Sequence, residues 1–541
     1  MSQEGLTGAL MVCGTTSDAG KTTLVTALCR VLARRGVSVA PFKAQNMALN
    51  SAVTPSGHEI GRAQAAQAAA AGVAPEVAMN PILLKPTSDH SSQVIVSGEP
   101  WATLDAAAYH RAKPELLGLV LEYLADLRRR FDVVLCEGAG SPAEINLLDS
   151  DIVKLRLALQ AGVPAVVVGD IDRGGVFAAL YGTVMLLPPE LAAIIKGFVI
   201  NKFRGDPALL STGPAELARR CGVPTLGVVP MLQGIGIDAE DSLALDGPWA
   251  PGAPLPAVDG KMAGASAVGS SVVGGSRASL DVAVIRFPRI SNFTDLDPLR
   301  LEAGVSVRMV DCAGALARPD LVILPGTKAT VADLEWLRTS GLAAGVTALA
   351  ATPGVTILGM CGGYQMLGTR IVDAVEASHA ADVQGLGLLA VRTRFDPAKV
   401  TRRVSGRALG HPIAGYEIRH GRTTGAAKSW VELDQVGAVG ASGTTIAASR
   451  DATSASDGAV LGTSVHGLME ADGFRGAFLA AVARRAGRQW RSSGASFAAA
   501  REARFDLLAD VVEAHLDMAA VESLIASARP VRRRDPDGAL A

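Results

Sequence analysis

The stretch "ALMVCGTTSDAGKTTLVTAL", residues 9–28, decides the fold of the first half of the chain. An apolar run ends at Gly14, a loop of small and polar residues follows, and an amphipathic helix is predicted from Lys21 onward. This order of strand, loop and helix is that of a phosphate-binding loop, in which backbone N–H groups and the helix N-terminus hold the phosphates. In such a loop Lys21 reaches the terminal phosphates and the Thr22 hydroxyl meets Mg²⁺.

The loop has five residues between Gly14 and Gly20, one more than the usual spacing, so a chance glycine-rich turn is the alternative. The flanking strand and helix favour the phosphate loop. The predicted nucleotide contacts are Gly14, Thr15, Asp18, Gly20, Lys21, Thr22 and Thr23.

Apolar runs alternate with helical patterns through the rest of this half of the chain. Buried strands are predicted within 131–140, 163–172, 194–203 and 225–230. Their nearly continuous apolar character is typical of a parallel sheet that is covered by helices on both faces. We therefore predict an α/β domain over residues 1–246, of the P-loop NTPase type.

Polar residues follow several of these strands, at the edge where ligands of open α/β sheets bind. Glu137 ends one strand and is predicted to bind Mg²⁺ with Thr22, the alternative being a capping glutamate. Asp170 and Asp172 end another strand and are predicted to contact substrate, although such a pair also forms turns. Asn201 and Lys202 end a further strand, in positions suited to a nucleotide base.

The composition changes at residue 247. Residues 247–279 are rich in Gly, Ala, Ser and Pro, cannot bury much apolar surface and are predicted to be a mobile linker. Strand patterns resume at 280–289, 319–327, 354–363 and 459–467, which indicates a second α/β domain over 280–528. Residues 529–541 are predicted to be a disordered tail.

The stretch "GVTILGMCGGYQML", residues 354–367, reads as a buried strand, a sharp turn and a helix start. Cys361 at this turn is predicted to be a nucleophile, because the small neighbours permit a tight turn and the helix N-terminus favours the thiolate. The Gly362 N–H is expected to face an oxyanion, and the turn at Gly326 to complete that site. A buried structural cysteine is the alternative.

A thiolate nucleophile needs a base, and His466 follows a strand pattern that would bring it to the same sheet edge as Cys361. The chain has eight histidines, and those at 58, 90, 110, 379, 411 and 420 can be read as loop histidines without a role.

Charge and composition exclude several classes of partner. The net charge is −1, from 51 basic and 52 acidic residues. The chain therefore lacks the excess of basic residues that is typical of proteins that bind nucleic acid or an anionic membrane. No apolar run approaches the roughly 20 residues needed to span a bilayer. Six widely scattered cysteines, without metal-binding spacing, favour a reducing cytoplasm.

The motifs together resemble the cobyric acid synthase family, glutamine-dependent amidotransferases of cobalamin biosynthesis. The resemblance rests on "APFKAQNMALNS", "GRAQAAQA", "MNPILLKP", "CEGAGSPAEINL", "IDRGGVFA", "INKFRGD", "LPGTKATVADLEWL", "GMCGGYQMLG" and "SVHGLME", together with the phosphate loop. It covers the chain apart from the linker and tail. The first domain is also similar to dethiobiotin synthetase, whose phosphate loop has the same extra residue.

The resemblance implies a reaction in two halves. Glutamine is hydrolysed in the second domain, and ammonia passes by a shielded route to the first domain, where ATP activates a carboxylate as an acyl phosphate. The implied substrate is adenosylcobyrinic acid a,c-diamide, amidated at its b, d, e and g side chains. By similarity to dethiobiotin synthetase, Lys43 in "APFKAQN" orients the carboxylate.

The chain departs from related patterns in two places. Many such amidotransferases have a glutamate two residues after the histidine, but here Leu468 stands there, as in cobyric acid synthases, and the sequence does not name the group that orients His466. In "GYEIRHGRT", Arg419 stands where a histidine is expected, and His420 follows.

Two rival functions and the oligomeric state remain open at this point. Cobyrinic acid a,c-diamide synthase shares the domain order but amidates two other carboxylates. A P-loop switch ATPase with a silent amidotransferase-like domain is the second rival, and it predicts no glutaminase activity. A homodimer is one option for the oligomeric state.

Overall fold

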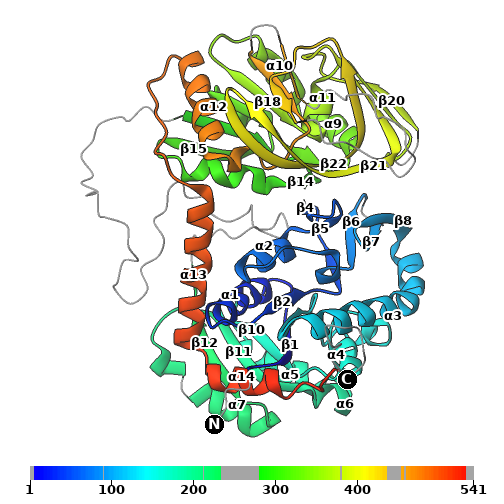
Figure 1. Ribbon diagram of the computed structural model, residues 1–541, viewed down its shortest axis with the longest axis vertical. Coiled ribbons are helices and arrows are strands. Elements are labelled where there is room, and N and C mark those ends of the chain that lie inside the picture. Colours follow the sequence, from blue (N-terminus) through cyan, green and yellow to red (C-terminus); the bar gives the residue numbers. More distant parts are fainter. Residues whose placement is uncertain are drawn as a thin grey trace.

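A computed structural model of the chain describes residues 5–88, 90–210, 212–232, 280–377, 380–434, 452–455 and 458–531. The predicted linker 247–279 and all but three residues of the predicted tail 529–541 lie outside these ranges. Two α/β bodies stack on one another, with the first half of the chain below and the second above (Figure 1).

The lower body is built on a parallel sheet in the order β12-β11-β10-β1-β9-β2, which confirms the predicted fold class. Along β1, Leu10 and Val12 join the core under α1, whereas Met11 and Cys13 join the core on the opposite face. Both faces are therefore covered, as a nearly continuous apolar strand requires. The strands are β1 (Gly8–Gly14), β2 (Val39–Phe42), β9 (Val133–Glu137), β10 (Ala165–Asp170), β11 (Ile195–Phe203) and β12 (Thr225–Pro230).

The helices of the lower body connect these strands. They are α1 (Lys21–Arg34), α2 (Arg62–Ala70), α3 (Ala106–Arg130), α4 (Leu155–Ala161), α5 (Val176–Met185), α6 (Pro189–Ala192) and α7 (Thr212–Cys221). The long insertion between β2 and α3 forms two small sheets, β3-β6-β7-β8 and β4-β5. Their strands are β3 (Gln45–Met47), β4 (Ser51–Val53), β5 (Glu59–Gly61), β6 (Ile82–Pro86), β7 (Ser91–Val96) and β8 (Glu99–Asp105), and they face the upper body (Figure 1).

The upper body has a second sheet, in the order β15-β13-β16-β18-β25-β24, parallel except for β24. Its strands are β13 (Leu280–Ile285), β15 (Val305–Val310), β16 (Leu321–Leu324), β18 (Thr356–Met360), β24 (Ala452–Ser454) and β25 (Val460–Thr463). Its helices are α8 (Ala313–Leu316), α9 (Thr330–Thr339), α10 (Leu342–Ala350), α11 (Gly362–Leu367) and α12 (Asp472–Arg485).

Two further sheets complete the upper body. The short pair β14 (Ile290–Ser291) and β17 (Gly326–Thr327) is antiparallel. The other sheet consists of β19 (Arg370–Asp373), β20 (Ala381–Gln384), the long hairpin β21 (Val391–Ala408) and β22 (His411–Gly425), and β23 (Val431–Leu433). No sequence pattern predicted this hairpin, whose β22 lies over the lower body (Figure 1).

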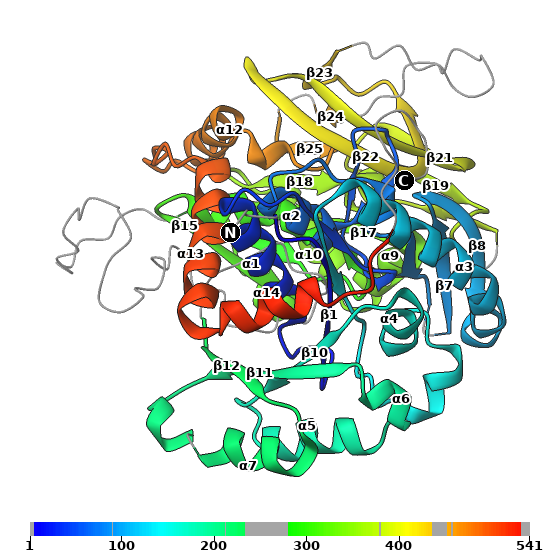
Figure 2. The ribbon, with the colours of Figure 1, turned by 60° about the horizontal axis from the view of Figure 1, so that its bottom comes forward.

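The C-terminal helices return to the lower body, which corrects the predicted domain boundary at 528. Helix α13 (Phe497–His515) runs down beside α1, and α14 (Met518–Ala526) lies across the base of the sheet (Figures 1 and 2). Phe505 and Leu508 are buried in the same core as Leu28, and Arg30 Nε bonds Asp506 Oδ1 at 2.7 Å. The physical reason is an apolar face that fits α1, and helical periodicity alone does not reveal which sheet such a face covers.

Within the described ranges, no helix combines the length and the apolar character that a bilayer-crossing segment needs.

Candidate active site

The predicted phosphate loop lies at the carboxyl edge of the lower sheet, between β1 and α1. Gly20 adopts a left-handed conformation, with φ of 94°, just before α1, and a side chain there would collide with Asn201. Lys21 is buried and donates to the carbonyl oxygens of Thr16 and Ser17, at 2.8 and 3.0 Å. Thr15 N–H bonds the carbonyl of Val168, and Thr23 is exposed on the first turn of α1.

A buried polar cluster lies beside this loop, where β9 ends. Glu137 is 1% exposed and accepts hydrogen bonds from Thr22 Oγ1 at 2.8 Å, Lys43 Nζ at 2.9 Å and Gln67 Nε2 at 2.6 Å. Burial alone would raise the pKa of Glu137, but Lys43 and the two other donors hold the pKa below its ordinary value. The sequence-predicted residues Thr22, Lys43 and Glu137 are thus in direct contact.

The other predicted strand-end residues lie on the opposite side of β1, where β10 and β11 end. Asn201 Nδ2 donates to the carbonyl of Ala19 at 2.9 Å, and Lys202 Nζ bonds both Asp18 and Asp170. Asp172 forms an ion pair with Arg204 at 2.9 Å. The structure therefore packs Asn201 and Lys202 against the phosphate loop, whereas Asp170 and Asp172 are held in ion pairs away from the Glu137 cluster.

The second predicted site lies at the carboxyl edge of the upper sheet. Cys361 stands between β18 and α11 with φ of 49° and ψ of −108°, a backbone geometry that non-glycine residues seldom adopt. Its N–H bonds the carbonyl of Thr463 at 2.7 Å, and its side chain is 8% exposed. The strained backbone of Cys361 therefore places this thiol at the carboxyl end of β18.

His466 follows β25, the neighbour of β18, and lines the same pocket as Cys361. Its other side is held by Asp295, whose Oδ2 lies 2.6 Å from His466 Nδ1 and whose Oδ1 accepts from Gly467 N at 2.7 Å. Burial alone would lower the pKa of His466, but Asp295 and Cys361 together raise it to about 10. At neutral pH the imidazole therefore carries its proton, in the pocket that also holds the Cys361 thiol.

The two glycines predicted for an oxyanion site lie beside the thiol. A side chain added to Gly362 would approach Thr327, and one added to Gly326 would approach Ser291 and the His466 ring. The Gly362 N–H belongs to the first turn of α11, where amide groups lack partners within the helix. Gly362 thus lines the pocket together with Cys361 and His466, and the Gly326 backbone lies close to the His466 ring.

Family models match both halves of the chain. Residues 10–243 match the CobQ/CobB/MinD/ParA nucleotide binding domain, and residues 281–474 match the CobB/CobQ-like glutamine amidotransferase domain. The chain is 52% identical to a cobyric acid synthase of Frankia casuarinae over 97% of its length and 98% of that protein. The cobyric acid synthase of Nocardia farcinica is 49% identical, with the same coverage of each chain.

The chain belongs to the cobyric acid synthase family.

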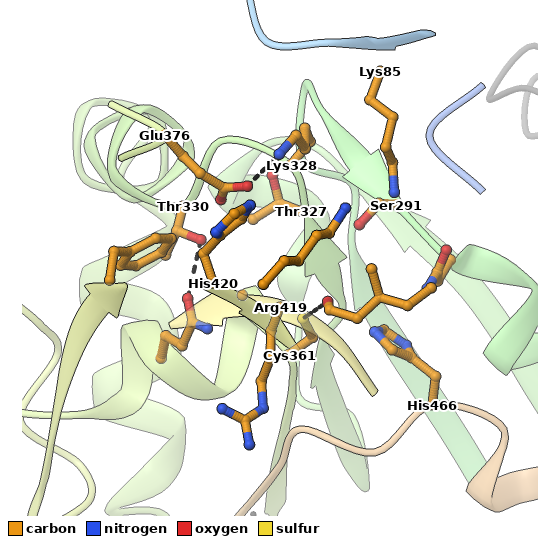
Figure 3. Close-up of a pocket in the computed structure, with 16 residues that line it drawn as sticks. Lys85, Ser291, Thr327, Lys328, Thr330, Cys361, Glu376, Arg419, His420 and His466 are labelled. Atoms are coloured by element: carbon orange, nitrogen blue, oxygen red, sulfur yellow. Dashed lines mark hydrogen bonds and ion pairs between the residues drawn. The ribbon is translucent and has the colours of Figure 1, made fainter. Parts of the chain in front are cut away.

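The pocket in front of Cys361 is completed by the lower body. Figure 3 shows Lys85, from β6 of the lower body, entering this cobyric acid synthase pocket from the side opposite Cys361. Lys85 and Lys399 both form ion pairs with Glu59, whose side chain has no exposed surface. Burial lowers the pKa of Lys399 to about 8, although Glu59 opposes this shift.

Charges of both signs line the remaining walls of the pocket. Lys328 and Glu376 form an ion pair next to His420 (Figure 3). Burial would raise the pKa of Glu376, but Lys328 and the neighbouring His420 hold it below its usual range. Arg419, found where a histidine was expected, lines the pocket while bonding Glu417 and the carbonyl of Gly421. His420 is therefore a buried wall residue rather than a loop histidine.

Sequence reasoning missed Asp295 and the Glu59 network. Asp295 lies 171 residues before His466, on the 3₁₀ helix η5 (Phe293–Leu301), and its "FTDLDP" context carries no motif. Tyr416 was also missed, although its ring stacks on His466 at 5.3 Å between centroids and its hydroxyl donates to the Ser51 carbonyl at 3.0 Å. The only available signal for Ser51 and Glu59 was their place within or beside the family motifs.

Proposed function

We propose that the chain is a glutamine-hydrolysing ligase that converts adenosylcobyrinic acid a,c-diamide to adenosylcobyric acid, adding amides at the b, d, e and g side chains. The observation that carries the proposal is that one chain holds two complementary half-sites. In the upper body, Cys361 shares a pocket with His466, which is hydrogen-bonded to Asp295, and in the lower body Thr22 and Lys43 both bond Glu137. The relatives named cobyric acid synthase favour this reaction over that of an a,c-diamide synthase.

In the upper half-site, the Cys361 thiolate bonds the amide carbon of glutamine, and the carbonyl electrons move onto oxygen near the N–H groups of Gly362 and Gly326. As the carbon–nitrogen bond breaks, His466 gives its proton to the departing nitrogen and ammonia leaves. A water then attacks the thioester, His466 accepts the proton of that water, and glutamate leaves. Asp295 keeps Nδ1 protonated throughout, so that Nε2 handles the transferred proton.

The charged pocket walls suit glutamine, which carries an α-carboxylate and an α-ammonium group. We assign Lys328 and Lys399 to the neighbourhood of the carboxylate and Glu376 to that of the ammonium group, because these charges line the pocket from the Cys361 side outward. Burial strengthens such charge recognition since the local dielectric is low.

In the lower half-site, a carboxylate becomes a good electrophile only when its leaving oxygen is phosphorylated. Lys21 and the loop N–H groups neutralise the phosphates of ATP, and Lys43 orients the substrate carboxylate. Lys43 is 4% exposed and already holds a carboxylate, that of Glu137. Asn201 and Lys202 are proposed for the base side of the nucleotide, and Asp170 and Asp172 for substrate.

Thr22 and Glu137 fit a magnesium ion. A hydroxyl and a carboxylate 2.8 Å apart at the phosphate loop are the hard oxygen donors that Mg²⁺ takes beside phosphates. When bound there, Mg²⁺ would offset negative charge that develops on the phosphoryl oxygens. Gln67 keeps the second Glu137 oxygen in place.

The direct test is to incubate the protein with adenosylcobyrinic acid a,c-diamide, ATP and glutamine, and to count and locate the new amides by mass spectrometry. The proposal predicts amides at b, d, e and g. A parallel reaction with cobyrinic acid that yields only a and c amides would show the diamide synthase activity instead. ATP turnover without glutamate release would support the switch ATPase.

A further inference from the structure

One short segment of the lower body joins the two half-sites. At its start, the Glu59 carboxylate on β5 binds Lys85 and Lys399 at the Cys361 pocket. At its end, Gln67 on α2 donates to Glu137 at 2.6 Å. Two strand steps and two helical turns span roughly 15 Å from Glu59 to Gln67. In Figure 1, β5 and α2 lie between the upper body and the lower sheet.

Between these ends lies an amide cluster formed by Asn46, Gln64, Gln67 and Asn80. Gln64 and Gln67 have no exposed surface, and Asn46 and Asn80 are each 1% exposed. Asn46 Nδ2 donates to Gln64 Oε1 at 2.9 Å, and Asn80 Oδ1 accepts from Gly61 N–H at 3.1 Å. Four buried amide side chains in one place are unusual, because each carries more polar atoms than a dry interior can pair.

Three polar atoms of the cluster have no hydrogen-bond partner among the described residues: Asn46 Oδ1, Gln64 Nε2 and Gln67 Oε1. Exchanging oxygen and nitrogen in both Asn46 and Gln64 reverses their mutual bond and still leaves one unpaired polar atom on each. An unpaired buried polar atom costs about 1–3 kcal/mol, so three together indicate a site for a small polar guest.

Gly61 lets three of the amide side chains pack directly against the backbone. Its φ of −58° is open to any residue, so its backbone does not require glycine. A Cβ at this position would lie 2.7 Å from Gln64 Oε1, 2.8 Å from Asn46 Nδ2 and 2.9 Å from Asn80 Oδ1. Three amide tips therefore fill the position that a side chain would need, and two of these amides, Asn46 and Gln64, also carry the unpaired atoms.

We propose that the amide cluster is the relay through which ammonia passes from the Cys361 pocket to the Lys43–Glu137 site. Ammonia donates three N–H groups and accepts at one lone pair, which matches two unpaired carbonyl oxygens and one unpaired amide nitrogen. It is neutral, so crossing a buried path costs far less than for ammonium. This inference rests on the proposed function and specifies how its two half-sites communicate.

Gly61→Ala tests the relay, because it adds one methyl group at the point where the amides converge. Three rates are measured on the full chain: glutamate release, amide formation from glutamine, and amide formation from ammonium salt. The relay predicts that amides formed per glutamate released fall by at least about tenfold, or about 1.4 kcal/mol. Glutamate release and ammonium-supported amidation stay close to wild type, which also shows that both sites remain folded.

Gln64→Leu provides a second probe, since it keeps the volume and removes the polar atoms, and the same uncoupling is expected. Gly118→Ala is the matched control, because a methyl group added there, on an exposed position of α3, meets nothing within 4 Å. If Gly61→Ala and Gln64→Leu leave the number of amides per glutamate unchanged, the cluster holds only a structural water and the relay is overturned. An equal loss of amidation with glutamine and with ammonium salt also overturns the relay. If the wild-type protein itself forms no corrinoid amide, the proposed function fails instead.

Discussion

At the scale of single residues, Cys361 is proposed to release nitrogen from glutamine, and Lys21 is proposed to bind the phosphates of ATP. Cys361→Ser should abolish glutamate release and glutamine-dependent amidation, because a serine hydroxyl beside His466 is a far weaker nucleophile than a thiolate. Amidation supported by ammonium salt should remain. The measurement is amide formation with each nitrogen source.

Lys21→Ala should form no amide with glutamine or with ammonium salt, since it removes the charge proposed to face the phosphates. The same assay of amide formation measures this.

Asp295→Asn isolates the group that orients His466. Without the carboxylate, the pKa of His466 falls from about 10, because burial disfavours the charged imidazole and its carboxylate partner is gone. The imidazole then loses its proton at lower pH, and the alkaline limb of the glutaminase pH profile moves to lower pH. We expect kcat to fall by about 10²–10⁴-fold. An unchanged pH profile would contradict the role of Asp295, and Asp297→Asn, on the same 3₁₀ helix, is the control.

The sequence predicts site residues that directly follow the strands of the sheet. It does not predict site residues that lie on other elements, far away in the chain. Cys361 and His466 follow neighbouring parallel strands, so strand order alone brings them to one edge. Asp295 lies on a 3₁₀ helix, 171 residues away from His466 in the chain, and no sequence pattern predicts that the two residues are in contact. Lys43 was placed through family resemblance, whereas its bond with Glu137 became visible only in the structure.

At the scale of elements, α13 shows that a sequence pattern does not predict which sheet a helix packs on. The chain up to residue 528 was predicted to belong to the second domain, but an apolar helix face does not specify its partner. The structure pairs α13 with α1 through Leu508 and its neighbours, and through ion pairs of Arg30 and Arg34. The two large parallel sheets were predicted well because buried parallel strands are nearly continuous apolar runs.

Leu508→Ala tests this packing. Leu508 has no exposed surface, so removing its outer carbons should lower the free energy of unfolding by about 2–5 kcal/mol. Hydrogen exchange should show the loss of protection in α1 and β1 of the lower body, although residue 508 follows the amidotransferase-like sequence. Ala514→Ser, at an exposed position of the same helix, should leave both quantities unchanged. Loss confined to the upper body would contradict the assignment of α13.

At the scale of the whole molecule, the two bodies share a buried charge network. Glu59 of the lower body holds Lys85 of its own body and Lys399 of the upper one. Glu59→Gln leaves two buried ammonium groups without their carboxylate, which should cost about 3–5 kcal/mol and loosen the interface. Hydrogen exchange should rise in β4, β5 and β22. Glu99→Gln, the same change at an exposed carboxylate, should have no such effect.

The central claim is that nitrogen released at Cys361 is used within the same molecule. The most direct measurement supplies glutamine with heavy nitrogen in its amide group, together with unlabelled ammonium in solution, and reads the isotope in the corrinoid amides. We expect heavy nitrogen at the b, d, e and g amides, undiluted by the ammonium pool at neutral pH. Corrinoid amides that carry the isotope ratio of the solution, or no corrinoid amides at all, would contradict it.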